Sequence, residues 1–295
     1  MAASMIKTEN SVSNKANKES QSKVMVLKIV NFLLFAAISV VLILPFYALV
    51  ITTFKNGAQA IANGMDISLK GLTFKNYIVL FTQPNSFFTW FGNSLFLTIV
   101  SVVLQLLLSA YVAYGFAGYD FKGKNFLFTC VLFVMAVPFE ILMLPLYSQI
   151  NNMHLTDTYT GIVLPGIVAA GTVFFFRQYL SGIPRDLAEA GRIDGASEYG
   201  IFFRIILPVM KPAFAAMAIL NTMGSWNNLL WPLLVLKTSS KFTLPIGINT
   251  LFTPYGNNYD VVFVGSFLSI LPILIIFLFF QKYIIDGMTA GAVKG

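Results

Sequence analysis

Six long apolar stretches, separated by short polar segments, limit what this chain can fold into. A helix needs about 20 mostly apolar residues to cross the hydrocarbon core of a bilayer, and these stretches have that length. The mean hydropathy of +0.77 and the 11% of charged residues are unusual for a soluble domain. The predicted spans are Ile29–Ile51, Trp90–Phe116, Phe126–Ile150, Gly161–Leu180, Ala213–Leu236 and Val261–Ile284. The sequence therefore predicts an all-α membrane protein with six transmembrane helices in one domain, residues 29–295.

The distribution of lysine and arginine predicts the direction of the spans, because positively charged loops are retained in the cytoplasm. Of the 19 basic residues, 14 lie in the two terminal segments and in the loops that follow the second and fourth spans, and 5 lie in the other loops. We therefore expect both termini in the cytoplasm. Residues 1–28 would form a flexible cytoplasmic tail, residues 52–89 an extracytoplasmic loop, and residues 181–211 a cytoplasmic loop.

Several functions are disfavoured by the residues. The net charge of +7 comes from basic residues scattered between apolar runs, so we expect a lipid bilayer and no nucleic acid as a partner. Cys130 is the single cysteine and His154 the single histidine, which leaves no disulfide framework and no expected metal cluster. No phosphate-binding G-x-x-x-x-G-K-[ST] sequence occurs, and the nearest fragment, Lys122–Asn125, lacks the first glycine. We expect no enzyme activity and no cofactor bound by this chain.

A charged, glycine-containing stretch, EAGRIDGASEYGIFFRIILP, runs from Glu189 to Pro208 within the predicted cytoplasmic loop. Pro184 suits the first turn of a short helix, and Gly195 suits the left-handed residue that would end it. Ser197 can then cap a second short helix. The sequence predicts a helix–turn–helix, either as a docking element for another protein or as an amphipathic hairpin lying on the lipid surface.

The same stretch resembles the EAA motif of the permease subunits of ATP-binding cassette (ABC) importers. Glu189-Ala190, Gly195 and Ile205-x-Leu207-Pro208 match, whereas Gly191 stands where the family usually has a second alanine. GSWNNLLWPLLVL and the terminal GMTAGAVKG are similar to the carbohydrate-uptake, maltose-type members. The resemblance covers about Leu72 to Gly295 and implies the transmembrane permease subunit of a sugar importer in the bacterial cytoplasmic membrane.

The resemblance also implies partners and a coupling site. The partners would be a second homologous permease, two ATP-binding cassette ATPases that hold ATP and Mg, and an extracytoplasmic solute-binding protein that delivers the sugar substrate. The loop would couple to the ATPases through Glu189, Ala190, Gly191, Asp194, Gly195, Ala196 and Pro208. In this hypothesis Glu189 contacts the ATPase and the two small residues after it allow close approach. The alternative is that Glu189 only stabilises the N-terminal end of its helix.

Polar residues inside the predicted spans are candidates for the substrate pathway. Glu140 lies between Pro138 and Pro145, and an ionisable group there either lines a pathway or bonds to a neighbouring helix. Carboxamides and aromatic rings suit sugar binding, although they also join helices and anchor them at the interface. The remaining candidates are Tyr147, Asn221, Trp226, Asn227 and Asn228, and the same reasoning extends to Trp231, Gln105 and Asn93.

Two other functions compete with sugar import. The EAA motif is shared by importers of several solute classes, so an ABC permease for a non-sugar solute fits most of the same residues. A membrane receptor or scaffold that docks a cytoplasmic protein would also use such a hairpin. Stimulation of the partner ATPase by a loaded binding protein distinguishes these functions, because a scaffold predicts none.

Overall fold

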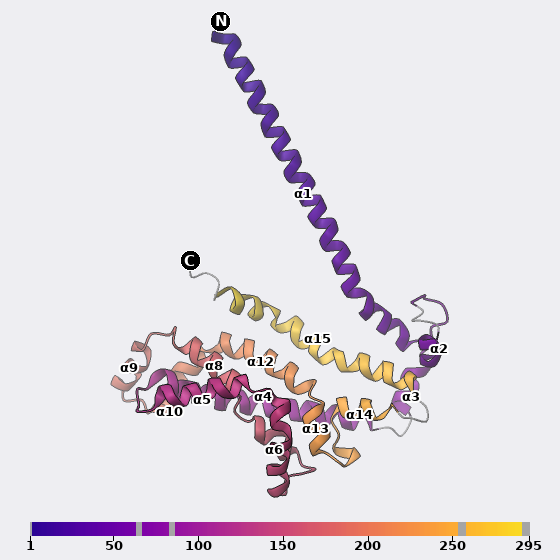
Figure 1. Cartoon of the computed structure of the whole chain (residues 1–295), viewed down its shortest axis with the longest axis vertical. Helices are drawn as coiled ribbons and strands as arrows, with labels where there is room; N and C mark the ends of the chain where they lie inside the picture. The colour runs from indigo at the N-terminus through magenta and orange to yellow at the C-terminus, as the bar shows by residue number, and fades with distance from the viewer. Residues whose placement is uncertain (1, 63–66, 83–85, 253–257, 291–295) are drawn as a thin grey trace. The chain divides into compact units, whose positions relative to one another are not determined.

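The computed structural model describes the backbone of residues 2–62, 67–82, 86–252 and 258–290 (Figure 1). Side chains are described for residues 24–57, 59–61, 67–82, 86–252 and 258–279. The last five residues of the predicted family signature GMTAGAVKG lie outside the described part. The chain divides into two compact units, residues 1–76 and 77–295, which we describe separately.

The first unit is dominated by helix α1, Ala2–Thr53, followed by the short helix α2, Gly57–Ala62. No glycine or proline precedes Pro45 in α1, so the backbone is helical through residues 2–28, where we expected a flexible tail. From Val24 to Tyr47 its large apolar side chains are exposed. The C-terminal end of α1 is closed by the side chain of Asn76. Its amide donates to the carbonyls of Thr53 and Lys55, at 2.9 and 2.6 Å, and so satisfies acceptors that a helix end leaves open.

The second unit is built from helices, and no strand occurs among its described residues. Its α-helices, of which the first begins within residues 1–76, are α3 (Lys75–Thr82), α4 (Phe87–Gly118), α5 (Lys124–Ala136), α6 (Phe139–Asn152), α7 (Tyr159–Val163), α8 (Ala170–Leu180), α9 (Asp186–Ile193), α10 (Glu198–Ile201), α11 (Leu207–Val209), α12 (Lys211–Trp226), α13 (Leu230–Val235), α14 (Leu244–Thr250) and α15 (Tyr259–Ala290). The 3-10 helices are η1, Leu164–Gly166, and η3, Ser239–Lys241. The turn η2, Phe202–Ile206, is a π-helix.

Helix α4 is the element on which the second unit is assembled. It packs against α8, α12 and α14, and α12 also packs against α15 (Figure 1). Ala110 and Ala113 of α4 are fully buried, and small residues at such positions let helices in a membrane protein approach closely. On the facing helices, Phe176 of α8 stacks on Phe214 of α12 with ring centroids 4.8 Å apart. Close packing of three helices therefore fixes the centre of this unit.

Three helices are long and apolar enough to cross a membrane by themselves: residues 24–53 of α1, all of α4, and residues 259–279 of α15. Three bent pairs pass the same test when each is counted as one span, which gives up to six. The pair α5 and α6 bends by 104° at Val137–Pro138 (Figure 1), and the segment from α7 through η1 to α8 bends by 42° after Pro165. Proline cannot donate the intrahelical hydrogen bond, which accounts for a break at these points.

The predicted continuous span Ala213–Leu236 is wrong. Helix α12 ends at Trp226, and residues 227–229 separate it from α13. The N–H groups of Asn227 and Asn228 close this end on the carbonyls of Met223 and Ser225, at 3.2 and 3.3 Å. The bent pair at this part of the chain instead joins residues 198–209 to α12 at 78°. Apolar length alone could not reveal this break, because Leu229–Leu236 continues the hydrophobic run.

Helix α14 lies so close to α4 that one glycine decides the fit. A Cβ added at Gly247 would overlap the ring of Trp90, which is itself buried. We predict that Gly247→Ala lowers the thermal midpoint of the purified protein, since overpacking costs about 1–3 kcal/mol. Gly115→Ala in α4 is the matched control, because nothing lies within 4 Å of its added Cβ. Equal midpoints for the two variants would contradict the close packing of α14 on Trp90.

Candidate functional site

The turn between α9 and α10 has the geometry that the sequence predicted. Gly195 has φ of +78°, in the left-handed region that suits glycine. Its N–H donates to the Arg192 carbonyl at 3.0 Å, and the N–H of Ala196 donates to the Gly191 carbonyl at 2.9 Å. These two bonds form a complete Schellman motif, which ends α9. Ser197 then caps α10 by accepting the N–H of Gly200 at 3.2 Å. The predicted helix–turn–helix is confirmed as local structure, and we call residues 184–209 the hairpin.

The second half of the hairpin is anchored in the helical core. Ile201, Phe202 and Ile206 are at most 4% exposed and belong to the cluster formed by α4, α8 and α12. The Phe202 ring meets Tyr111 of α4 edge to face, with centroids 5.2 Å apart. Tyr199, on which Tyr111 stacks at 6.1 Å, remains 66% exposed. The hairpin therefore packs directly on the C-terminal half of α4.

Polar contacts hold the two halves of the hairpin together. The Arg192 guanidinium donates to both carboxylate oxygens of Glu198, at 2.7 and 3.3 Å, and Tyr119 at the end of α4 donates its hydroxyl to the same carboxylate. Arg192 also lies over the Tyr119 ring, 5.6 Å from its centroid. We call these three residues the Glu198 clamp. Because its members come from α9, α10 and the end of α4, the clamp fixes the angle of the hairpin.

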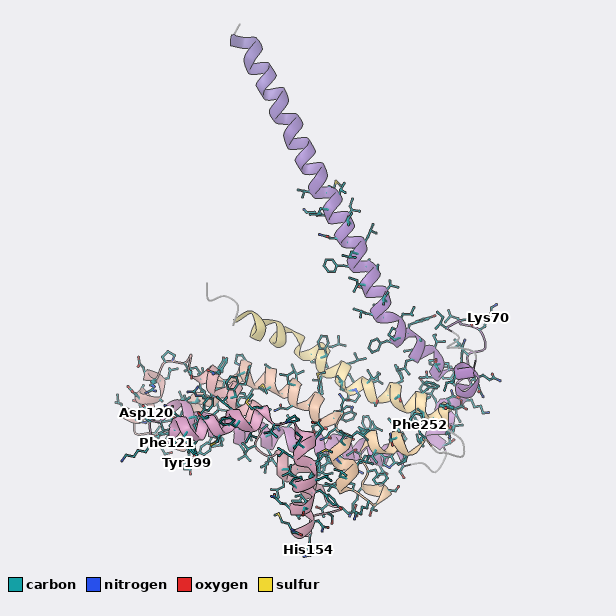
Figure 2. The ribbon with its side chains drawn as sticks, in the orientation of Figure 1. Lys70, Asp120, Phe121, His154, Tyr199 and Phe252 are labelled. Carbon is teal, nitrogen blue, oxygen red and sulfur yellow. The ribbon has the colours of Figure 1, made fainter. Side chains whose placement is uncertain are left out.

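A second ionic contact joins the hairpin to the loop between α4 and α5. Asp120 accepts from Lys124 at 3.0 Å and from Arg185 at 3.2 Å. These hydrogen bonds, from Lys124 first and then from Arg185, hold the pKa of Asp120 below its usual value. The Asp120 side chain is 74% exposed, so water screens both pairs. Figure 2 shows Asp120, Phe121 and Tyr199 gathered at one end of the second unit, with Phe252 at the opposite end.

The structure assigns Gly191 a different role from the one the sequence suggested. Gly191 is buried inside the hairpin, and an added Cβ would lie 2.7 Å from Cδ1 of Ile205 and 3.1 Å from Cγ1 of Ile201. Its small size therefore serves packing within this chain, and it does not belong to an exposed docking face. The other predicted coupling residues, Glu189, Ala190, Asp194, Gly195, Ala196 and Pro208, are exposed.

A polar cavity of about 250 Å³ lies within the second unit. Its walls come from α4, α7, η1, α12 and α13 and from Asn228 and Thr243 beside these helices. Gln105 holds η1 in place by donating to the Gly166 carbonyl at 3.0 Å, and Asn221 shares a hydrogen bond with Thr172 of α8. The polar residues of the helical walls and of the α12 end are Ser94, Ser101, Gln105, Asn221, Ser225 and Asn228. No charged side chain is among the described residues that line the cavity, so its chemistry is that of neutral hydrogen bonding.

The predicted pathway residues fall into three groups. Asn221 and Asn228 lie in the cavity wall. Trp226 is buried in the core, where its indole N–H donates to the Ser269 carbonyl at 3.0 Å, and Tyr147 packs in an apolar cluster with Ile150 and Trp231. Asn227 and Glu140 are exposed and do not line the cavity. The structure therefore does not bring Glu140 and the asparagines together.

Sequence reasoning missed the serines of the cavity wall. In an apolar helix a serine looks like ordinary helix–helix contact, so Ser94, Ser101 and Ser225 gave no separate signal. A usable signal was nevertheless present, because Ser94, Ser101 and Gln105 follow one another at seven and four residues. That spacing places all three on one face of a helix.

Comparison with known proteins agrees with this arrangement. Residues 105–290 match the model of the family described as binding-protein-dependent transport system inner membrane component. The arabinooligosaccharides transport system permease protein AraQ of Halalkalibacterium halodurans is 51% identical over 263 residues, 88% of this chain and 94% of that protein. AraQ of Bacillus subtilis is 50% identical over 272 residues, with 92% and 97% covered. The lactose transport system permease protein LacG of Rhizobium radiobacter is 34% identical, with 85% and 91% covered.

A solved structure gives the same fold. A chain of a bacterial ABC transporter involved in the import of the acidic polysaccharide alginate superposes with a TM-score of 0.79, covering 88% of this chain and 96% of that one at 23% identity. The family match and the similar permeases, together with the long apolar helices, define an ABC-type membrane permease. The chain belongs to the family of binding-protein-dependent transport system inner membrane components.

The Glu198 clamp leads to a charge-reversal prediction. Arg192→Glu alone or Glu198→Arg alone places like charges beside each other, so amide hydrogen exchange over residues 195–200 should become faster. The double variant restores an opposite pair and should return exchange close to the original rate. Since exposed pairs contribute only about 0.2–1 kcal/mol, the effect should stay local. Asp194→Arg, a reversal at an exposed carboxylate for which no hydrogen bond was found, is the control; a double variant as fast as the singles would contradict the clamp.

Proposed function

We propose that this chain is a transmembrane permease subunit of an ABC importer that carries a neutral oligosaccharide, an arabinooligosaccharide, across the bacterial cytoplasmic membrane. The observation that carries the proposal is the identity of 50–51% to two arabinooligosaccharide permease proteins over nine-tenths of the chain. The uncharged polar cavity supports it, because hydroxyl, amide and carbonyl groups can exchange hydrogen bonds with sugar hydroxyls. A non-sugar solute has less support, since the relatives at 34–51% identity named above are sugar permeases.

The exposed side of α9 is the proposed docking surface for a cytoplasmic ATPase. Ile193 is 86% exposed at the end of this helix, beside exposed Ala190 and Ala196. A large isoleucine side chain left in water favours a partner with an apolar pocket. Three exposed carboxylates lie on α9 or at its C-cap: Asp186, Glu189 and Asp194. We therefore expect an ATPase groove with an apolar floor and a basic rim.

The proposed mechanism is alternating access, driven from outside this chain. ATP and Mg would be held by two ATPase subunits, whose closure would displace the hairpin. The Schellman turn and the Glu198 clamp stiffen the hairpin, and its apolar residues pack on α4, so a displacement would pass to α4. The polar cavity has α4 as one wall and would change shape with it. A second homologous permease would complete the pathway, and a solute-binding protein would deliver the sugar.

The membrane arrangement is part of the proposal. Six spans would be formed by α1, α4, α15, the bent pairs α5–α6 and α7–α8, and α12, whose bent partner, residues 198–209, belongs to the hairpin. The hairpin would face the cytoplasm together with both termini, as the distribution of basic residues indicates. A receptor that docks a cytoplasmic protein without transport would use the same hairpin, but it would not need a polar cavity within the bundle.

A bulky substitution on the docking surface should uncouple transport. Ala190 is exposed on α9, so Ala190→Trp leaves the hairpin fold unchanged and blocks the close approach of the ATPase. We expect loss of arabinotriose uptake by the assembled transporter in proteoliposomes, with unchanged affinity of the binding protein for the sugar. The matched control is Ala136→Trp, the same substitution at an exposed alanine of α5, outside the proposed docking surface. Normal uptake by the Ala190→Trp variant would contradict docking through α9.

The proposed function is tested by purifying the chain from its native membrane and measuring ATP hydrolysis by the proteins that accompany it. We expect a second permease and an ATPase, with hydrolysis stimulated by a solute-binding protein loaded with arabinotriose. A complex that hydrolyses ATP but transports another solute would support the importer and contradict the sugar. Recovery of the chain with a non-transport partner and no stimulated hydrolysis would favour the receptor.

A further inference from the structure

The loop that ends at Thr243, a residue of the cavity wall, is held in place from several directions. Residues 237–243 connect α13 to α14, and η3 lies within them. Trp90 and Asn93, from the first turns of α4, donate side-chain hydrogen bonds to this loop. The Trp90 indole reaches the Ser239 carbonyl at 3.1 Å, and the Asn93 amide reaches the carbonyls of Ser240 and Phe242 at 2.9 Å. Backbone carbonyls that would otherwise face the cavity region are thereby satisfied.

Asp157 holds the other end of the same loop. Its carboxylate accepts the N–H groups of Lys237 and Thr238 at 2.9 and 3.1 Å, the Thr238 hydroxyl at 2.7 Å and the Lys241 ammonium at 2.9 Å. The Thr238 hydroxyl, followed by the backbone N–H of Lys237, is the main cause of a strongly lowered pKa of Asp157. The group stays ionised throughout the physiological range, so the loop is fixed at neutral pH.

Thr243, the last residue of this fixed loop, lines the cavity and is only 5% exposed. It occupies the N-cap position of α14, where a threonine hydroxyl usually accepts a backbone N–H, but here it makes no capping bond. Pro245 at the second helical position has no N–H to offer, and the N–H of Leu244 is taken by the Ser94 hydroxyl at 2.7 Å. The Thr243 hydroxyl has no hydrogen-bond partner among the described residues.

A buried hydroxyl without a partner destabilises a protein, and native structures rarely retain one. Two other buried polar side-chain atoms in the described residues lack a partner, on Tyr114 and Arg177, and neither residue lines this cavity. Thr243 is therefore the lining residue whose hydroxyl has no partner, and because that oxygen has almost no accessible surface, it would have to rotate about χ1 to reach a solute in the cavity. Ser94 and Ser225 flank the same cavity, so the surroundings are polar and uncharged.

We infer that the Thr243 hydroxyl binds a hydroxyl group of the transported solute and that the fixed loop 237–243 positions it for this contact. The inference rests on the proposed function and adds a specificity-determining residue to it. A threonine hydroxyl both donates and accepts, which matches a neutral sugar hydroxyl. Because no cation lines the cavity, a uronic acid would leave its carboxylate unpaired there, so the site selects neutral sugars over acidic ones.

Removal of the hydroxyl at constant shape tests the inference. In proteoliposomes that contain the whole transporter and binding protein loaded with arabinotriose, Thr243→Val should lower the maximal uptake rate about 3- to 10-fold, the range expected for one neutral hydrogen bond. Thr243→Ser keeps the hydroxyl and should retain most of the rate. Uptake by the Val variant at the original rate, or an equal loss in the Ser variant, would overturn the inference.

A labelling measurement tests the contact between the solute and position 243 even if the Thr243→Val variant assembles poorly. Thr243→Cys is introduced with Cys130→Ser, which removes the single native cysteine. During turnover, excess arabinotriose should slow alkylation at position 243 several-fold, and an equal excess of a galacturonate trimer should not. Equal alkylation with and without arabinotriose overturns the contact. A wild-type transporter that takes up no arabinotriose contradicts the proposed function, whereas wild-type uptake with no effect at position 243 contradicts this inference alone.

Discussion

The packing of α4 against α8 and α12 determines where both candidate sites lie. Small residues of α4, such as Ala110 and Ala113, allow the three helices to approach closely. Near its C-terminal end α4 presents Tyr111, Tyr114 and the C-cap residue Tyr119 to the hairpin, while its first and middle turns present Ser94, Ser101 and Gln105 to the polar cavity. A single continuous helix therefore connects the hairpin with the polar cavity.

The cavity lies between the continuous helix α4 and segments in which the other helices are interrupted. η1 and α13 are short helices beside breaks in the helical bundle, and both contribute to the cavity wall. In hydrocarbon, broken backbone needs internal partners, and this structure supplies them through side chains: Gln105 for Gly166, Trp231 for Gly161, and Asp157 for residues 237–238. Polar side chains thus satisfy the backbone groups at these breaks. The Thr243 hydroxyl, by contrast, has no hydrogen-bond partner among the described residues.

Local chemistry made the hairpin predictable from sequence. Gly195, Ser197 and Pro208 act through backbone constraints that depend little on tertiary contacts, and two of them occupy the turn and cap positions expected. The long runs that became α4 and α15 were also predicted, because length and hydropathy suffice for them. The buried place of Gly191 could not be predicted, since it depends on how Ile201 and Ile205 fold back over α9. For the same reason the sequence could not separate Asn221, in the cavity wall, from Asn227, which is exposed.

The central claim of the proposed mechanism is that the hairpin and α4 would move as one body when the proposed partner ATPases bind ATP. Spin labels at Phe203→Cys in the hairpin and Ile99→Cys in α4, both exposed positions, in a Cys130→Ser background report this directly by double electron–electron resonance. The account predicts one narrow distance distribution that is the same in the nucleotide-free and the ATP-bound transporter. A distribution that shifts or splits on ATP binding would show that the hairpin moves independently of α4 and would contradict the account.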